Sequence, residues 1–85
     1  MTLFQQLIMF SNFLETEEDY TLWILALYKL CKENMQKNPE LKLLYDVVTN
    51  AMETKQRTGS YINYFSRALA AEMRKILMEE LDCTI

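Results

Sequence analysis

The chain contains a single glycine, Gly59, and a single proline, Pro39, among its 85 residues. These two residue types most often turn or interrupt a backbone, so their scarcity leaves few places for turns. A chain with so few turn residues is typical of helices joined by short links. We therefore expect an all-α fold of three or four antiparallel helices, a helical hairpin or bundle, in one domain covering residues 1–85.

Hydrophobic periodicity places the first two helices. Apolar residues at helical spacing predict a helix over residues 2–14. An acidic link follows at residues 15–19, where Thr16 and Asp19 are expected to form a capping box for the second helix. The second helix should run to about Lys37.

The Asn38-Pro39 pair is expected to start the third helix, with Asn38 as the cap and Pro39 in the first turn. Such a short link implies that the second and third helices are antiparallel. The apolar positions assigned to the third and fourth helices are Leu41, Leu44, Val48, Ala51, Ile62, Phe65, Leu69 and Ile76.

Gly59 decides whether the third and fourth helices are separate. A break there would make Gly59 the C-terminal cap of one helix and Ser60 the N-cap of the next. A continuous helix over residues 39–82 would instead be roughly 65 Å long, at 1.5 Å per residue. That length suits an antiparallel dimer but not a monomer of this size. We favour the break.

The second helix is apolar around most of its circumference, since Lys29 is the only charged residue between Leu22 and Cys31. Apolar residues make up 51% of this short chain, whose core is marginal by itself. A helix of this kind is central or lies in an oligomer interface. We therefore expect a homodimer.

Several functional classes lack their usual residues. The chain has no histidine, the commonest general base and metal ligand. No nucleophile–base pair, phosphate-binding loop or dinucleotide motif occurs, and the acidic clusters read as caps and solvated residues. We expect no enzyme activity, no metal and no cofactor. The two cysteines share no motif, and no signal or membrane-spanning segment is visible, so we expect a cytoplasmic protein that does not enter a membrane.

The stretch from Thr54 to Ala71 contains none of the twelve acidic residues. This acid-free window holds three cations and several neutral hydrogen-bonding side chains, a combination that suits phosphate oxygens. On one helix, four of the candidates would lie within about 40° of a common line. After a break at Gly59, the cations would instead flank the open amides of a helix N-terminus. The candidate nucleic-acid-binding residues are Lys55, Arg57, Ser60, Asn63, Arg67 and Arg74. The alternative is an ordinary solvated helix face.

Residues 38–75 resemble the helical core of the small RNA-silencing suppressors of insect nodaviruses. The likeness consists of an acidic and then apolar helix start, an acid-free middle with scattered Arg, Ser and Asn, and an Ala-rich continuation. Proteins of that family are all-helical homodimers that lie along double-stranded RNA. The resemblance implies that the six candidate residues face RNA phosphates and 2′-hydroxyls, and that the protein is a viral suppressor of a host defence.

Two functional hypotheses follow. The first is a non-enzymatic protein whose acid-free face contacts a nucleic-acid backbone, with duplex RNA favoured because it is read mainly by shape. The alternative is a small adaptor or inhibitor that docks a protein partner through an apolar surface rich in methionine and aromatic residues. For this alternative we expect contacts through Trp23, Met35 or Met73.

Overall fold

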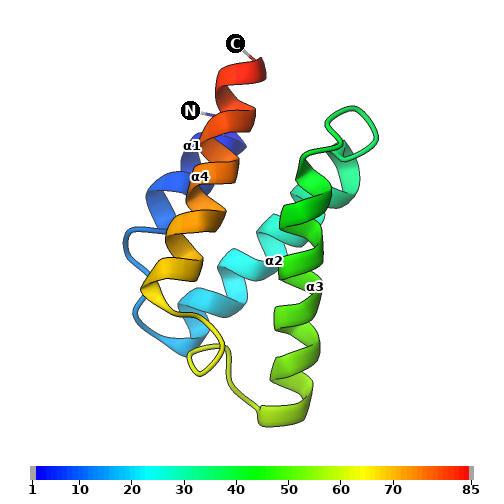
Figure 1. Ribbon diagram of the computed structural model, residues 1–85. Coiled ribbons are helices and arrows are strands. Elements are labelled where there is room, and N and C mark those ends of the chain that lie inside the picture. The colour runs from blue at the N-terminus through cyan, green and yellow to red at the C-terminus, as the bar shows by residue number, and fades with distance from the viewer. Residues whose placement is uncertain (1, 85) are drawn as a thin grey trace.

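The computed structural model describes residues 2–84, with side chains for residues 2–80. This part of the chain forms four helices, α1 (Leu3–Phe10), α2 (Glu17–Asn34), α3 (Leu41–Thr58) and α4 (Arg67–Thr84). No strand occurs between residues 2 and 84, and the all-α expectation is confirmed (Figure 1).

The helices pack as a bundle in which α1 contacts α2 and α4, and α3 contacts the same two helices. The α2–α3 pair runs in opposite directions, as expected, with α2 crossing obliquely (Figure 1). Helices α1 and α4 lie side by side, and α1 begins at the end of the molecule where α4 finishes. No helix in the described chain is long and apolar enough to cross a membrane.

The first two helices each begin with a reciprocal cap. At α2 the Asp19 amide donates to the Thr16 hydroxyl and the Thr16 amide donates to the Asp19 carboxylate, both at 3.1 Å, which confirms the predicted capping box. Thr2 and Gln5 form the same arrangement at α1. These caps satisfy amides that have no partner inside the helix.

Helix α1 ends at Phe10, so the expected helix over residues 2–14 is too long. The Ser11 hydroxyl donates to the carbonyl of Ile8 at 2.5 Å, and the Asn12 side-chain amide donates to the same carbonyl at 3.3 Å. Polar side chains that bond to nearby carbonyls compete with continuation of the helix. Residues 12–16 therefore form a link.

The start of α3 also differs from expectation. Glu40, not Asn38, holds the N-cap position, and it makes no side-chain cap hydrogen bond. The first amides of the helix bond instead to backbone carbonyls three residues earlier, from Leu41 to Asn38 and from Lys42 to Pro39, each at 3.0 Å. A backbone turn thus performs the capping that the sequence assigned to a side chain.

Gly59 ends α3 in the left-handed conformation, with φ of 81°, and its amide bonds to the carbonyl of Lys55. The predicted break is confirmed, and the single long helix is excluded. Ser60, however, does not begin the next helix. Helix α4 begins at Arg67, where the Ser66 hydroxyl accepts a hydrogen bond from the Leu69 amide at 3.1 Å, the pattern of an N-cap.

We expect Gly59→Ala to lower the free energy of unfolding by about 1 kcal/mol, because alanine resists the left-handed conformation. A β-carbon at this position would meet no atom within 4 Å, so the loss comes from the backbone alone. Thermal denaturation should show a lower Tm, and Gly59→Asn should lose less because asparagine tolerates this conformation. A higher Tm for Gly59→Ala would contradict the observed cap.

The core lies along α2, where Trp23, Ile24 and Leu27 are at most 1% exposed. All other helices contribute to it, as does the α3–α4 link through Tyr61 and Phe65. The remaining buried members are Leu7, Leu30, Cys31, Leu41, Leu44, Val48, Ala51, Met73 and Leu77. Phe65 stacks on Tyr20 with ring centroids 5.3 Å apart and meets Trp23 edge-on at 6.1 Å, which fixes the link against α2.

Candidate functional site

The six predicted binding residues lie on three segments. Lys55 and Arg57 lie in the last turns of α3, Ser60 and Asn63 in the α3–α4 link, and Arg67 and Arg74 on α4. Because residues 60–66 are not helical, the common line expected along one helix does not exist. Some of these residues also form hydrogen bonds or ion pairs with other helices of the described chain, and the others do not.

Lys55 and Ser60 surround the carboxylate of Glu17, the first residue of α2. The Ser60 hydroxyl and the Ile62 amide each donate to Oε2 of Glu17 at 3.2 Å, and the Tyr61 amide donates to Oε1. Nζ of Lys55 lies 3.9 Å from the same Oε1. The acid-free window is therefore in contact with Glu17 of α2. Its amides and the Lys55 ammonium group already bind this carboxylate, which is an anion of the protein itself.

Burial raises the pKa of Glu17, but the amides of Tyr61 and Ile62, the Ser60 hydroxyl and the charge of Lys55 together hold that pKa below its ordinary value. The carboxylate is therefore ionised at neutral pH. Lys55 is also fixed on its other sides, since Nζ donates to the Thr21 hydroxyl at 3.0 Å and lies 4.4 Å from the centre of the Tyr61 ring.

Arg74 is tied to the end of α1. Its Nε donates to the Ser11 hydroxyl at 2.7 Å, and its Nη2 donates to the Ser11 carbonyl at 3.2 Å. A cation at the C-terminal end of a helix satisfies a free carbonyl and interacts favourably with the helix dipole. The primary role of Arg74 is thus to join α4 to α1.

Arg57, Asn63 and Arg67 are exposed, and neither arginine forms a salt bridge with an acid of the described chain. Arg57 reaches only the Thr54 hydroxyl, at 3.4 Å. Arg67 lines a cleft of about 440 Å³ between α4 and the α1–α2 link. The cleft is lined by Ser11, Asn12, Leu14, Glu15, Tyr20, Arg67, Ala70 and Arg74. It combines two guanidinium groups with one carboxylate.

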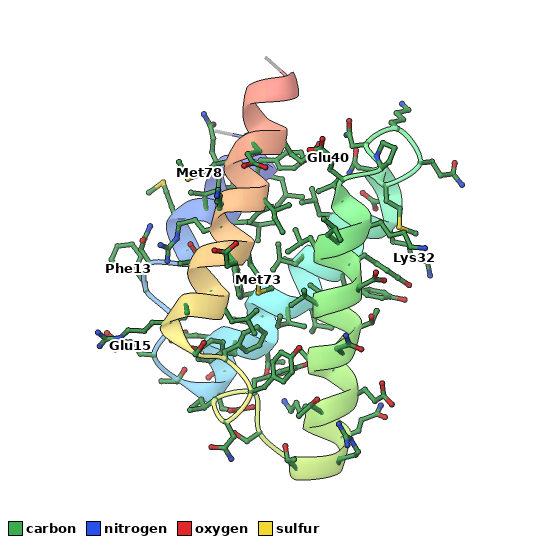
Figure 2. The ribbon with its side chains drawn as sticks, viewed as in Figure 1. Phe13, Glu15, Lys32, Glu40, Met73 and Met78 are labelled. Carbon is green, nitrogen blue, oxygen red and sulfur yellow. The ribbon has the colours of Figure 1, made fainter. Side chains whose placement is uncertain are left out.

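Five of the eight large exposed apolar side chains of the described chain lie on α1, the link after it and α2. We call this region the α1–α2 face and define it by Leu3, Met9, Phe13, Leu22 and Leu25, which are 45% to 67% exposed. Figure 2 shows Phe13 pointing away from the helices. The other large exposed apolar residues are Leu43, Ile62 and Met78, which lie on three different segments.

Two hollows lie along the α1–α2 face. One, of about 240 Å³, is lined by Leu3, Gln6, Leu7, Phe10, Leu22, Trp23 and Ala26. The other, of about 260 Å³, is lined by Gln6, Met9, Phe10 and Phe13. Both are lined by Gln6 and Phe10, so they adjoin one another along α1. We call the first, which lies between α1 and α2, the groove. Trp23 is only 1% exposed and reaches this surface only as part of the groove lining, while Met73, also 1% exposed, lines neither hollow, so Met73 is not an exposed contact residue as expected.

Glu80 is a buried acid on α4, only 3% exposed, close to the carboxyl group of Glu40 at the start of α3. Figure 2 places the Glu40 side chain between these two helices. Burial raises the pKa of Glu80, and the hydrogen bond with Glu40 and the charges of Glu40 and Glu79 raise it further. Glu80 therefore opposes folding when it ionises.

We expect Glu80→Gln to raise the free energy of unfolding at pH 7, while Glu79→Gln, at an exposed neighbour, leaves it within about 0.5 kcal/mol. A raised carboxyl pKa means that the stabilising proton is fully bound below the unfolded pKa and is lost as pH rises through the folded pKa. Denaturation between pH 4 and pH 8 should therefore show a gain for Glu80→Gln that grows with pH. A constant difference would contradict this origin.

The described side chains offer little other reactive chemistry. Residues 2–80 include no group of three or more metal-ligating side chains arranged to hold an ion. Cys31 is free and fully buried, and burial raises the pKa of its thiol to about 12, which makes it unreactive. The side chain of Cys83 lies outside the described residues.

Comparison of the chain with protein-family models, curated proteins and solved structures found no match in any of the three. The site must therefore be interpreted from its own geometry. The residues of the α1–α2 face were not predicted from the sequence, although residues 1–14 contain no charged side chain, which is a signal for such a face. The contact between Glu17 and the α3–α4 link was not predicted either, and the sequence offers no local signal for it.

Proposed function

We propose that this protein is a non-enzymatic binding protein that docks the apolar surface of a protein partner through the α1–α2 face. The observation that carries this proposal is that four large exposed apolar residues, Leu3, Met9, Phe13 and Leu22, line two adjoining hollows, with Leu25 on the same helix as Leu22. Single exposed apolar residues are common on soluble proteins, but a joined set around a hollow is typical of interaction sites. Methionine and aromatic residues without charge are also typical of the centre of an interface.

The groove favours a helix as the docked element. It lies between two helices and is lined almost wholly by apolar side chains, the arrangement that receives the apolar side of an amphipathic helix. Its volume of about 240 Å³ has room for a few apolar side chains. The rest of the partner would lie over Met9 and Phe13.

A photoreactive amino acid placed at Phe13 or Leu22 tests this docking. We expect each variant to form a covalent adduct of defined mass with a protein in the cells that produce it. The control carries the same group at Asn50, an exposed polar position on α3, and should form none. Folded variants that form no adduct at residues 13 and 22, or as much at residue 50, would contradict the proposal.

A second candidate is the predicted contact with duplex RNA, which the unpaired cations at the end of the bundle favour. Arg57 and Arg67 form no ion pair, and Arg67 and Arg74 line the same open cleft. Guanidinium groups beside neutral donors such as Asn63 suit phosphate oxygens. Lys55 and Ser60 contribute less, because Glu17 already occupies them.

A gel-shift assay with duplex RNA, duplex DNA and single strands tests this candidate. At about 50 mM salt, where phosphate contacts are strongest, Arg67→Glu should abolish binding, and the same reversal at Lys42, an exposed cation at the start of α3, should not. Affinity should be higher for RNA than for DNA. Equal effects of the two variants, or no binding by the unmodified protein, would contradict this candidate.

A further inference from the structure

The outer side of α2 carries a regular stripe of four exposed residues, Glu18, Leu22, Leu25 and Lys29. Their spacing of four, three and four residues keeps them on one line of the helix, as in helices that pair side by side. Leu22 and Leu25 are 56% and 50% exposed. Glu18 and Lys29 form no ion pair or hydrogen bond in the described chain.

We propose that the partner at the α1–α2 face is a second copy of this chain, bound with its α2 antiparallel to the α2 described here. This inference rests on the proposed docking function of that face. A two-fold axis between Leu22 and Leu25 places each of these residues opposite the other one in the second copy. It also places Glu18 opposite Lys29 of the second copy, twice in each dimer.

The charges at the two ends of the stripe select the orientation. In a parallel pair Glu18 would face Glu18 and Lys29 would face Lys29, which is repulsive. In the antiparallel pair each carboxylate faces an ammonium group, and the two helix dipoles also oppose one another. Such exposed ion pairs add little affinity, but they decide which arrangement is allowed.

The opposite charges at the two ends of the stripe also favour a second copy of this chain over a different protein as the partner. Each chain carries a net charge of −3, so two copies have like net charges that oppose association. They can meet most easily where the charges cancel, and the stripe has one acid and one base at mirrored positions. The neighbouring α1 contributes no charge, since residues 1–14 are uncharged. Binding to a different protein would not require an acid and a base at positions related by a two-fold axis.

Leu25→Glu tests whether this stripe forms the interface. Leu25 is preferred to Leu22 because it does not line the groove against Trp23. One substitution alters the interface twice in a symmetric dimer, so dimerisation measured by sedimentation should weaken at least about 100-fold. The matched control is Leu43→Glu, at a residue 65% exposed on α3, which should dimerise like the unmodified chain. Circular dichroism should show equal helix content in both.

Charge reversal tests the orientation. Glu18→Lys and Lys29→Glu each place like charges opposite one another in the antiparallel pair, so each should weaken dimerisation by about tenfold. The double variant restores opposite charges with exchanged positions and should return to within about threefold of the unmodified chain. In about 0.5 M salt the single variants should approach the unmodified chain, because exposed charges are screened.

The outcomes separate this inference from the docking function on which it rests. A chain that stays monomeric at about 100 µM, with adducts at residues 13 and 22 to a different protein, would overturn the second copy but keep the docking function. A dimer that Leu43→Glu disrupts and Leu25→Glu does not would place the interface elsewhere and overturn the inference. A dimer that Leu25→Glu disrupts, but that the double charge reversal does not restore, would overturn the antiparallel arrangement.

Discussion

Replacing Trp23 by alanine is expected to lower the free energy of unfolding by about 3 to 5 kcal/mol. The Trp23 side chain is 1% exposed and meets the ring of Phe65 edge-on at 6.1 Å. Its removal would leave a cavity where α1, α2 and the α3–α4 link meet, because the surrounding helices can collapse only in part. A domain of this length has a total stability of roughly 4 to 13 kcal/mol, so much of it would be lost.

The indole nitrogen allows the packing of Trp23 to be separated from its hydrogen bond. Nε1 donates to the carbonyl of Leu7 at 3.1 Å, which joins α2 to α1. Trp23→Phe keeps an aromatic ring but removes this donor, so it should cost less than alanine, about 1 to 2 kcal/mol. Trp23 is the only tryptophan, so both variants lose the tryptophan fluorescence signal. Their denaturation should therefore be followed by circular dichroism. A loss below about 1 kcal/mol for Trp23→Ala would show that this ring does not hold the core together.

Local sequence signals account for the helices and their caps. Thr16 and Asp19 lie three residues apart in front of an apolar segment, and the box they form needs no distant contact. The helix end at Gly59 can be predicted in the same way, because glycine adopts the left-handed conformation more easily than other residue types, and Gly59 is the residue that adopts it in the described chain. Both features were predicted correctly, since each depends on residues within one turn of the helix end.

The start of α4 could not be predicted in the same way. Ile62 and Phe65 continue the apolar spacing of a helix, and Ser60 is a good N-cap residue, so periodicity placed the helix start too early. In the structure Phe65 turns inward against Tyr20 and Trp23, and Glu17 binds the amides of Tyr61 and Ile62. Partners more than forty positions away thus override the local preference.

The candidate site shows a related limit. Leu22, Ile24, Leu25 and Leu27 are equally apolar in the sequence, which predicts that α2 is central or forms an interface. Only the packing of the other helices shows that Ile24 and Leu27 are buried while Leu22 and Leu25 remain exposed. The stripe with Glu18 and Lys29 therefore becomes visible only once the buried side of α2 is known.

The contact between Glu17 and the α3–α4 link makes Glu17→Gln informative. An amide in place of the carboxylate presents a donor where the amides of Tyr61 and Ile62 and the Ser60 hydroxyl require acceptors. Hydrogen bonds to a charged group contribute more than neutral ones, although Glu17 is 35% exposed and solvent weakens them. We expect the free energy of unfolding to fall by about 2 kcal/mol. Hydrogen exchange should also become faster at the amides of Tyr61 and Ile62.

The adjacent Glu18→Gln is the matched control, because it removes the same charge from the first turn of α2 but leaves the link untouched. It should cost no more than about 0.5 kcal/mol through the helix dipole. The two variants should also differ in their dependence on pH. A lowered carboxyl pKa gives stability that is present above the unfolded pKa and is lost as pH falls through the folded pKa. The ordinary pKa of this carboxyl is 4.5, so the unmodified protein should exceed Glu17→Gln at pH 7 and approach it in more acidic solution. Equal losses for the two variants at pH 7 would mean that helix capping, and not the bond to the α3–α4 link, is what Glu17 contributes.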